Sequence, residues 1–473
     1  MSRLASLPET WDVLIIGAGP AGMAAATVTA SAGLSTLVVD EGPGPGGQIW
    51  RAIMTTPVMS RPILGSDYWA GAPAVRTFYE SGATYLPSTQ VWSLDADGVA
   101  GLSADGVARY VTAKRVVIAT GAMERPFPVP GWTLPGVLTV GAAQGLLKTS
   151  GHYPSGRLVI AGTGPLVWLY AAQLLAAGGR ISALLDTTDP GARLAATRSF
   201  PAFAASPYLA KGLTLMAKVR ARVRVLRKVT ALAIDGHDRA TSVRFRRGAG
   251  SEEQIPADTV LLHQGVVPQV NLAMAAGVPH RWDDRQLCFV PELAPFGQTA
   301  VERIAIAGDG AGISGWEAAV ERGRLAGIGA ARALGISHDS LPSPDAPIRR
   351  LRTLARPRAF LDVFYRPAVA FRRPAPETIV CRCEEVTAGE VERAVEIGAL
   401  GPAQLKSYTR CGMGPCQGRM CGLTVTELMA AKRGVSPAEI GYFRLRAPVK
   451  PITLAEIASL PVDGTIVKAV VRS

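Results

Sequence analysis

The feature that most constrains the fold is the run DVLIIGAGPAGMAAATVTASAGLSTLVVDEG, residues 12–42. A strand of the buried type, residues 13–16, leads into a G-x-G-x-x-G turn and an alanine-rich helix. The first glycine permits the sharp turn, the second lets a pyrophosphate approach the backbone, and the third lets the helix pack closely on the strand. Amide groups at the start of such a helix point at the phosphates. The run predicts a dinucleotide site at Gly17, Gly19, Pro20, Ala21 and Gly22.

An acidic pair closes the second strand of this run, residues 35–39. Asp40 and Glu41 stand about 20 residues after the glycine turn, the spacing at which an acid binds a ribose hydroxyl. Asp40 is the stronger candidate because it ends the strand directly. The alternative is that both side chains are only the solvated end of a strand.

Three later stretches distinguish FAD from NAD. Residues 41–51 are glycine-rich and let the backbone approach a flat ring, residues 115–121 are a strand ending in A-T-G, and residues 301–312 are a strand ending in G-D-G before a helix. This set resembles flavoproteins with two dinucleotide-binding domains, the thioredoxin reductase and disulfide reductase relatives. The resemblance implies that Asp309 binds the ribityl chain of FAD, although Asp309 can also be only a helix N-cap. It places Gly47, Gln48, Ala119, Thr120, Gly121 and Gly308 at the cofactor as well.

Residues 156–186 repeat the strand–turn–helix–strand plan in degenerate form. Gly162 and Gly164 are present, but Val167 replaces the third glycine, which puts close seating of a pyrophosphate in doubt. Asp186 ends the next strand and suits a ribose hydroxyl better than a 2′-phosphate. A site for NAD, a site for another adenine nucleotide and a structural remnant remain open. The fold class expected is α/β, with two Rossmann-like domains and a small helical domain after them.

The other chemistry of the first 380 residues is sparse. They contain no C-x-x-C, which excludes the disulfide exchange of thioredoxin reductase, and Cys288 is expected to be a small buried hydrophobe. His263, on an apolar strand, can be a catalytic base but is more simply a satisfied core residue. No catalytic residue is predicted.

The formal net charge of +13 suggests an anionic partner, yet the charge is dispersed and no basic stripe with interleaved aromatics favours nucleic acid. Residues 220, 222 and 224 form an alternating arginine stretch, either a solvated face or a docking surface for an acidic partner. The two uncharged runs, 13–39 and 158–179, each combine a strand, a turn and a helix, so neither is expected to span the membrane. Without a signal peptide, the expected location is cytoplasmic.

Residues 336–376 are rich in proline and arginine and are expected to be a connector that wraps the surface. Leu351, Phe360, Phe364 and Phe371 argue against free disorder in it.

Five of the six cysteines fall within residues 381–421. Their spacing, C-x-C and then two gaps of four residues, does not suit a zinc ribbon. Together with the signature TRxGMGxCQGxxC, it resembles the 2Fe–2S domain of bacterioferritin-associated ferredoxin. The resemblance implies cluster ligation by Cys381, Cys383, Cys416 and Cys421, with Cys411 spare. Zinc or an empty thiol cluster is the alternative. Gly412, Gly414 and Gly418 would turn backbone amides toward the sulfides.

The order of the parts, with ATGAMERPFPVPGWTLPGVLTVGAAQ at 119–144, resembles the larger (α or A) subunit of heteromeric amino-acid and opine dehydrogenases. That group includes opine oxidases, hydrogen cyanide synthase and hydroxyproline dehydrogenases, and is related to the α subunit of heterotetrameric sarcosine oxidase. The resemblance implies electron transfer among a partner flavin, a 2Fe–2S cluster and FAD. It also implies a smaller FAD-containing, D-amino-acid-oxidase-like β subunit, and leaves open FMN at an interface and a small third subunit. The rivals are a self-contained NADH-dependent flavin/iron–sulfur reductase and a cluster-bearing scaffold with structural FAD.

The expected division of the chain has six parts. They are the first part of an FAD domain (1–125), a degenerate NAD-type domain (126–275), the second part of the FAD domain (276–335), a linker (336–376), a ferredoxin-like domain (377–440) and a tail (441–473).

Overall fold

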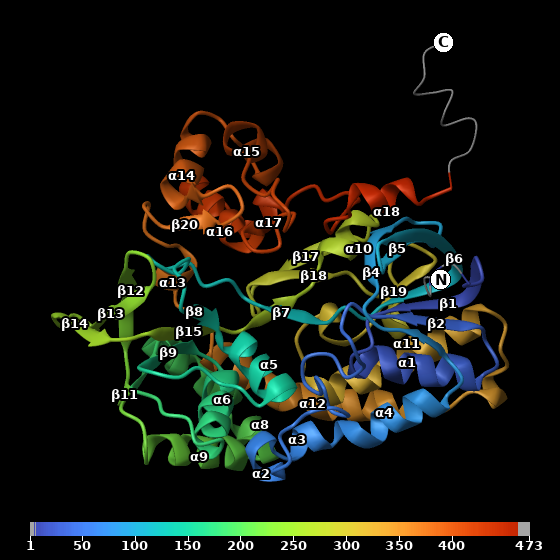
Figure 1. The fold of residues 1–473 in the computed structure, drawn as a ribbon, viewed down its shortest axis with the longest axis horizontal. Helices are drawn as coiled ribbons and strands as arrows, with labels where there is room; N and C mark the ends of the chain where they lie inside the picture. The colour runs from blue at the N-terminus through green and yellow to red at the C-terminus, as the bar shows by residue number, and fades with distance from the viewer. Residues whose placement is uncertain (1–3, 5, 462–473) are drawn as a thin grey trace.

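The computed structural model describes residue 4 and residues 6–461 of the chain (Figure 1). Its first body is built on a seven-stranded sheet of order β3-β2-β1-β6-β5-β4, with β19 paired to β6. Strands β1, β2, β3 and β19 run parallel to their neighbours, whereas β4 and β5 are antiparallel. The strands are β1 (Thr10–Ile16), β2 (Thr36–Val39), β3 (Thr84–Leu86), β4 (Gln90–Leu94), β5 (Val99–Ala104), β6 (Val107–Ile118) and β19 (Ile304–Ile306).

Two helices pack side by side on this sheet, α1 (Pro20–Ser31) and α11 (Trp316–Ala333). They approach closely because small residues face each other: a Cβ at Gly323 would lie 2.1 Å from the Ala21 carbonyl oxygen. Helix α4 (Gly71–Glu80) packs beside α1, and two short helices precede it, α2 (Arg61–Leu64) and α3 (Ser66–Trp69).

The second body contains a five-stranded parallel sheet of order β11-β10-β9-β15-β8. Its strands are β8 (Val137–Thr139), β9 (Leu158–Thr163), β10 (Ala183–Asp186), β11 (Val225–Leu226) and β15 (Thr259–Gln264). Its helices are α5 (Val140–Ser150), α6 (Pro165–Ala176), α7 (Pro190–Ala195), α8 (Phe200–Ala204) and α9 (Pro207–Arg220). An antiparallel sheet adds β12 (Val229–Gly236), β13 (Ala240–Arg247) and β14 (Glu252–Pro256).

The two bodies are joined by a pair of antiparallel strands, β7 (Ala122–Glu124) and β16 (Val266–Pro268). After β16 the chain returns to the first body through α10 (Asn271–Ala275), β17 (His280–Asp283) and β18 (Cys288–Pro291). Cys288 is buried, as predicted, and its burial raises the pKa of the thiol to about 12. One core cluster contains residues of both bodies, from Val13 and Ile15 to Leu158 and Val167, so the two sheets share an interior.

The proline- and arginine-rich segment differs from the predicted connector. Residues 345–364 form one helix, α12 (Asp345–Phe364), which contacts α11, α7 and α8, and α13 (Val369–Arg372) follows. Phe360, buried, stacks on Phe203 at 4.3 Å between ring centroids. The prediction weighted proline as a helix breaker. Pro347 falls in the first turn, where no intrahelical N–H partner is needed, whereas Pro357 is buried inside the helix and removes one of its backbone hydrogen bonds.

The cysteine-rich part is a separate small module, drawn in orange in Figure 1. It contains β20 (Ile379–Cys381), β21 (Val386–Thr387), α14 (Ala388–Glu396), α15 (Pro402–Thr409), α16 (Gly422–Arg433) and α17 (Pro437–Ile440). The predicted helical stretch after the first cysteine pair is α14, which opens with a capping box of Thr387 and Glu390. The chain then crosses back over the first body, where α18 (Leu454–Ala458) lies on β6. The six-part domain division itself stays a prediction.

Candidate functional site

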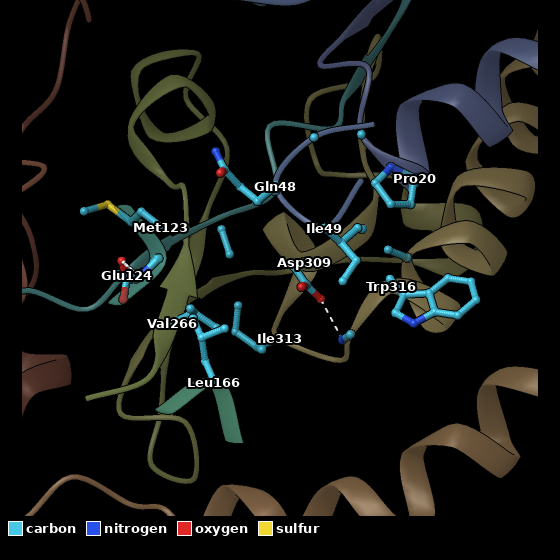
Figure 2. A pocket seen from close by; sticks show the side chains of 18 of the residues that line it. Pro20, Gln48, Ile49, Met123, Glu124, Leu166, Val266, Asp309, Ile313 and Trp316 are labelled. Carbon is cyan, nitrogen blue, oxygen red and sulfur yellow. Dashed lines mark hydrogen bonds between the residues drawn. The ribbon is translucent and has the colours of Figure 1, made fainter. Parts of the chain in front are cut away.

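A single cavity of about 1760 Å³ runs between the two bodies. Its wall includes residues of the first glycine turn and of the three stretches predicted to distinguish FAD (41–51, 115–121 and 301–312). Parts of α5, α6 and α9 from the second body, part of α12, and the loop that carries the last cysteines complete it. Figure 2 shows Pro20, Gln48 and Asp309 around this space.

The first glycine turn has the tight geometry that the motif predicts. Gly17 has φ +106°, and a Cβ there would lie 2.5 Å from the Ala119 carbonyl oxygen. A Cβ at Gly22 would lie 1.8 Å from the Gly17 carbonyl oxygen, so helix α1 could not pack as it does. Gly19 faces Gly47, whose Cβ would be 3.0 Å from the Gly19 Cα atom. The first glycine turn and the stretch 41–51 therefore meet next to the N-terminus of α1, which has no side-chain cap.

The acidic pair at the end of β2 is divided by the fold. Asp40 lies at the cavity and accepts hydrogen bonds from the Ala18 and Gly42 amides, both at 2.6 Å. Burial raises the pKa of this carboxyl above its usual value. Glu41 also borders the cavity, but it is largely exposed and forms an ion pair with Lys450, another residue of the wall. Of the two predicted residues, Asp40 is the one held against the glycine turn.

The third stretch brings Asp309 to the same cavity. Asp309 Oδ1 accepts hydrogen bonds from the Ser314 amide at 2.8 Å and the Gly315 amide at 3.0 Å, just before α11 (Figure 2). The side chain thus has a capping role, which was the alternative to ligand binding. Its Oδ2 atom has no hydrogen-bond donor among the described residues, and it belongs to the cavity wall.

Thr120 adds an unsatisfied polar group. Its hydroxyl is buried in the protein, has no hydrogen-bond partner among the described residues, and lies in the cavity wall beside Ala119 and Gly121. Buried hydroxyls are normally hydrogen-bonded, and this one is an unpaired polar group at the cavity wall. Close backbone approach at Gly19 and Gly47, a carboxylate oxygen and an orphaned hydroxyl are a donor and acceptor set that fits FAD.

A buried lysine, which sequence reasoning missed, supports the stretch 41–51. Lys148 of α5 is 2% exposed and donates hydrogen bonds to the carbonyl oxygens of Gln48 and Ile49, at 2.9 and 3.1 Å. Burial, followed by the nearby charge of Arg51, lowers the pKa of Lys148 from 10.5 to about 7. The only signal in the sequence is that Lys148 is the one charged residue of an apolar helix.

The degenerate second turn differs from the first in what surrounds it. Asp186 is already bonded to the Thr188 amide at 3.0 Å and to Arg193 at 2.6 Å. The imidazole of His263 packs against the turn: a Cβ at Gly164 would lie 3.2 Å from its Nε2 atom. His263 is buried and pairs through Nδ1 with Glu124 Oε1 at 2.6 Å, which agrees with a satisfied histidine, although both side chains border the cavity.

The arginines of the basic stretch at 220, 222 and 224 are exposed, and Arg220 packs over the Trp168 ring at 5.4 Å from the centroid.

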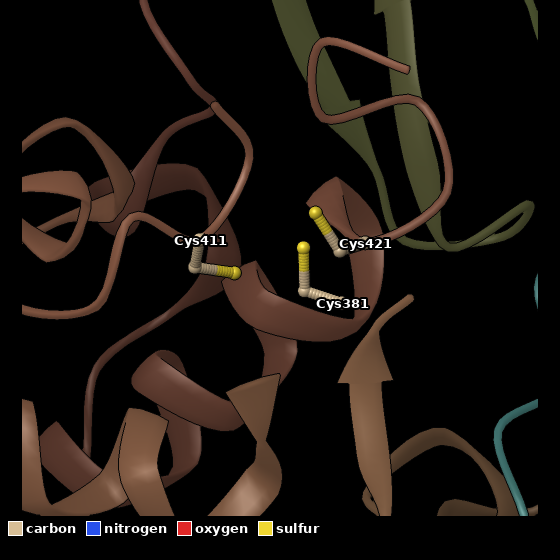
Figure 3. A group of neighbouring side chains, drawn as sticks. All are labelled: Cys381, Cys411 and Cys421. Atoms are coloured by element: carbon tan, nitrogen blue, oxygen red, sulfur yellow. The ribbon is translucent and has the colours of Figure 1, made fainter. Parts of the chain in front are cut away.

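The module brings its five cysteines together as a group of three and a neighbouring pair, and the predicted set of four ligands stays a prediction. The sulfur atoms of Cys381, Cys411 and Cys421 all lie within 4.8 Å of one another, and all three residues are buried (Figure 3). Cys411, predicted to be spare, is therefore inside the group. Cys383, exposed, and Cys416, half-buried, form a neighbouring thiol pair.

Hydrogen bonds favour a thiolate at the centre of this group. Donation from the Cys411 and Cys421 thiols, joined by the backbone amides of Gly412 and Glu384, lowers the pKa of Cys381 far below its usual value. The hydrogen bond to Cys381, against a smaller opposing effect of Cys421, raises the pKa of Cys411, and burial raises it further. Gly412 and Gly418 have φ values of +81° and +77°, and both lie against the Phe443 ring, where a Cβ would come within 2.6 and 2.5 Å. A close-packed set of thiols with backbone amides fits a cluster held by thiolates.

The module is attached to the first body beside the cavity. Arg419 and Met420 of the cysteine loop are part of the cavity wall, and Asn271 of α10 donates a hydrogen bond to the Gln417 carbonyl oxygen at 2.9 Å. Farther along, the Trp132 indole donates to the Ile379 carbonyl oxygen at 2.7 Å.

A buried cluster of charged side chains lies where β7 ends and binds the module to this point of the first two bodies. Arg125, directly after β7, donates to the carbonyl oxygens of Gln286 and Leu287 at 2.9 and 2.7 Å. Glu427 of α16 pairs with Arg125 at 3.6 Å and with Arg372 of α13. All three side chains are at most 10% exposed. Sequence reasoning missed both residues: Arg125 lies within the quoted stretch 119–144 but was given no role, and Glu427 is the one charged residue within GLTVTELMAA.

Among the described residues, no helix has both the length and the apolar character needed to cross a membrane.

Comparison with family models gives two matches. Residues 11–323 match pyridine nucleotide-disulphide oxidoreductase, and residues 375–460 match the sarcosine oxidase A3 domain.

Two curated relatives extend along the whole chain. The A subunit of opine oxidase from Agrobacterium tumefaciens (strain Ach5) is 47% identical over 99% of this chain and 96% of its own length. The HcnB subunit of hydrogen cyanide synthase from Pseudomonas aeruginosa is 31% identical over 95% of this chain and 99% of its own length.

Among solved structures, L-proline dehydrogenase from P. horikoshii superposes with a TM-score of 0.71 at 18% identity. It covers 95% of this chain and 79% of the other, and this likeness concerns the fold alone. The predicted α/β fold with two Rossmann-like bodies is confirmed, and so is the resemblance to the larger subunits.

Proposed function

The chain belongs to the pyridine nucleotide-disulphide oxidoreductase family and, along its whole length, to the family of the opine oxidase A subunits; from this premise we propose that it is the electron-transferring subunit of a heteromeric flavoenzyme that oxidises the C–N bond of an amino acid, an imino acid or an opine. The relatives that carry this premise are named as subunits of opine oxidase and hydrogen cyanide synthase. The proposal assigns this chain to transfer of electrons and assigns recognition of the substrate to a partner.

The observation that carries the proposal is the wall shared by the cavity and the cysteine loop. Arg419 and Met420 lie between Cys416 and Cys421 in the chain, and both face the cavity whose other walls hold the glycine turn and Asp309. A flavin in the cavity and a cluster on these cysteines would be next to each other, with one short loop between them. A scaffold with structural FAD would have no need of this arrangement.

The chain's own residues have distinct duties in this proposal. The turn at Gly17 and Gly19 and the start of α1 would hold the pyrophosphate, Asp40 a ribose hydroxyl, and Thr120 and Asp309 the ribityl chain. Cys381, Cys383, Cys416 and Cys421 would hold the cluster, as the family signature implies. FAD and a 2Fe–2S cluster together supply the conversion between two-electron and one-electron redox chemistry.

Three features of the second body support electron entry that does not depend on NADH. Val167 replaces the third glycine, Asp186 is engaged with Arg193 and Thr188, and the imidazole of His263 packs on Gly164. Val167 adds bulk where the third glycine would allow close helix packing, and the other two features engage Asp186 and Gly164 with side chains of the protein. Native mass spectrometry of the purified chain reports whether another adenine nucleotide is bound there.

The partner in this proposal is a smaller, FAD-containing, D-amino-acid-oxidase-like β subunit. FMN at the interface and a small third subunit remain further expectations of the resemblance. Nucleic acid is not among the proposed partners. The proposed site of action is the cytoplasm, where thiols are kept reduced and available to iron.

The test is anaerobic purification of the full chain, alone and with its co-purifying partner, followed by native mass spectrometry and assays of FAD, iron and labile sulfide. The proposal expects FAD and iron in the chain alone, with flavin absorbance unchanged by NADH. Adding partner and opine or amino acid should then bleach the flavin. Prompt bleaching by NADH without a partner would instead identify a self-contained reductase. Zinc in place of iron would remove the cluster from the scheme.

A further inference from the structure

The five cysteines of the module divide unevenly, three and two. The buried group contains Cys381, Cys411 and Cys421, and neither remaining sulfur lies within 4.8 Å of all three (Figure 3). The second group is the pair Cys383 and Cys416, nearer the surface. A 2Fe–2S cluster takes four cysteine ligands, two on each iron. One iron takes two cysteine sulfurs, so the buried group of three has one extra sulfur. The outer pair has no extra sulfur.

We propose that Cys411 is a reserve ligand, whose sulfur can replace that of Cys421 or of Cys381 on the buried iron, whereas no residue can replace Cys383 or Cys416. This inference rests on the proposed 2Fe–2S cluster. It concerns a residue that the family signature does not place among the ligands.

Distances within the buried group allow the exchange. A tetrahedral metal with metal–sulfur bonds of about 2.3 Å places two thiolates about 3.8 Å apart. Any two of the three sulfurs are at most 4.8 Å apart in the protein. Rotation about χ1 moves each sulfur between staggered positions without moving the backbone. Each pair of the three can thus reach the separation that one iron requires.

The backbone fixes Cys411 in this place. Arg410 before it has φ +60°, Gly412 after it has φ +81°, and the Thr409 hydroxyl accepts a hydrogen bond from the Cys411 amide at 3.2 Å. Cys411 itself is fully buried, so its thiol cannot turn to solvent. Its sulfur is therefore held beside those of Cys381 and Cys421.

The outer pair has no such reserve. Cys383 is exposed and packs against Gly414, where a Cβ would lie 2.2 Å from its own Cβ. Cys416 has Cys383 as its thiol neighbour. Loss of either sulfur leaves its iron with one protein ligand.

The test compares alanine variants of the two groups in the full chain, isolated anaerobically with its FAD. Iron and labile sulfide per chain, visible circular dichroism, and electron paramagnetic resonance after dithionite reduction are measured for Cys421→Ala, Cys381→Ala, Cys416→Ala, Cys411→Ala and the Cys411→Ala/Cys421→Ala double variant. Wild-type protein and Cys411→Ala should carry equal iron. Cys421→Ala and Cys381→Ala should keep most of it with an altered spectrum. Cys416→Ala and the double variant should lose it.

Burial makes this comparison strict, because alanine at fully buried Cys421 removes more packing than alanine at half-buried Cys416. Retained FAD and an unchanged far-ultraviolet spectrum show that a variant is folded; where alanine at position 421 does not fold, Cys421→Ser takes its place. Equal loss of iron in folded Cys421 and Cys416 variants overturns the proposal. Loss of iron in Cys411→Ala also overturns it, since Cys411 would then be an obligatory ligand. Iron-free wild-type protein would instead contradict the proposed cluster, which keeps the two failures distinct.

Discussion

At the scale of single residues, the motifs predicted which segments bind the cofactor, but not which role each side chain has there. Asp40 and Glu41 are neighbours in sequence, yet one lies at the glycine turn and the other pairs with Lys450. The position of two acids at the end of a strand does not tell which of them contacts the glycine turn. The signature leaves Cys411 out of the ligand set, and only the folded loop shows its sulfur beside two others.

Asp309 provides the first prediction at this scale. Replacing it by alanine removes the free Oδ2 acceptor and the cap on the Ser314 and Gly315 amides. A hydrogen bond to a charged group contributes about 1.5–3 kcal/mol, so FAD affinity should fall by about tenfold to a hundredfold. Equilibrium dialysis of FAD measures the change. Asp309→Asn keeps an acceptor for the amides and should bind with intermediate affinity; equal affinity in all three proteins would show that Asp309 is only a cap.

Lys148 provides a prediction for pH dependence. Its pKa in the folded protein, about 7, lies below its ordinary value of 10.5. The unfolded chain therefore binds more protons than the folded one between these values, and the free energy of unfolding rises with pH across that window. The contribution is complete above pH 10.5 and is lost as pH falls toward 7. Lys148→Met should flatten this rise.

Urea unfolding of the two proteins at about pH 7 and about pH 9.5, at one fixed FAD concentration, measures the difference. Parallel pH dependence in wild type and Lys148→Met would contradict the assignment, because every other titrating group is common to both.

At the scale of elements, the strands and helices that carry motifs were predictable, and those that depend on tertiary contacts were not. The strand expected at residues 13–16 is part of β1, and the helix expected after the first cysteine pair is α14. Helix α12 was not predicted because its prolines and arginines conceal an apolar contact with α8 and α11, visible only once those helices are in place. Proline content is a guide to local backbone preference, and packing overrides it here.

Helix α16 gives the prediction for this scale. Glu427→Gln leaves Arg125 and Arg372 buried without a carboxylate. Removing one partner of a buried ion pair costs about 3 kcal/mol or more. The variant should therefore unfold more easily and release the module from the first body. Unfolding in urea gives the first effect, and limited proteolysis of the segment between Arg373 and Ile379 gives the second.

Glu396→Gln is the matched control, because Glu396 pairs with Lys432 on the exposed face of the same module. Exposed pairs contribute little, so this variant should behave like wild type. If both variants behave alike, the buried cluster does not hold the module in place.

At the scale of the whole molecule, the sequence predicted which parts exist but not that they would share one cavity. Motifs report local turns and ligands, whereas the shared wall arises from contacts between residues far apart in the chain, such as Asn271 with Gln417. The sequence also did not predict how the segment around Val449 binds the first body. There the Val449 amide donates a hydrogen bond to the Trp92 carbonyl oxygen at 2.8 Å. No periodicity in either segment encodes such a pairing.

Arg419 tests whether the cysteine loop and the flavin act on each other. Arg419 is a residue of the cavity wall, and its Nε atom donates to the Cys416 carbonyl oxygen at 3.1 Å. A nearby cation favours the more negative, reduced flavin, so Arg419→Ala should shift the flavin midpoint potential to a more negative value. Spectroelectrochemical titration of the purified chain measures it. Arg382→Ala is the control, since Arg382 stacks on Trp132 at 5.3 Å from the ring centroid and is not in the cavity wall. Identical potentials in all three proteins would place Arg419 too far from the flavin to act on it.

The composition of the cavity wall has a consequence for how the protein is made. Gly17 and Gly19 emerge from the ribosome long before Met420, Val449 and Lys450 do. Because nascent chains fold from the N-terminus onward during translation, a cofactor captured early would rest in an open cleft for most of synthesis. Its enclosure waits for the wall residues between 419 and 450, and the cysteines at 381–421 precede or overlap that segment, so the thiols are delivered in the same stage of synthesis that closes the cavity.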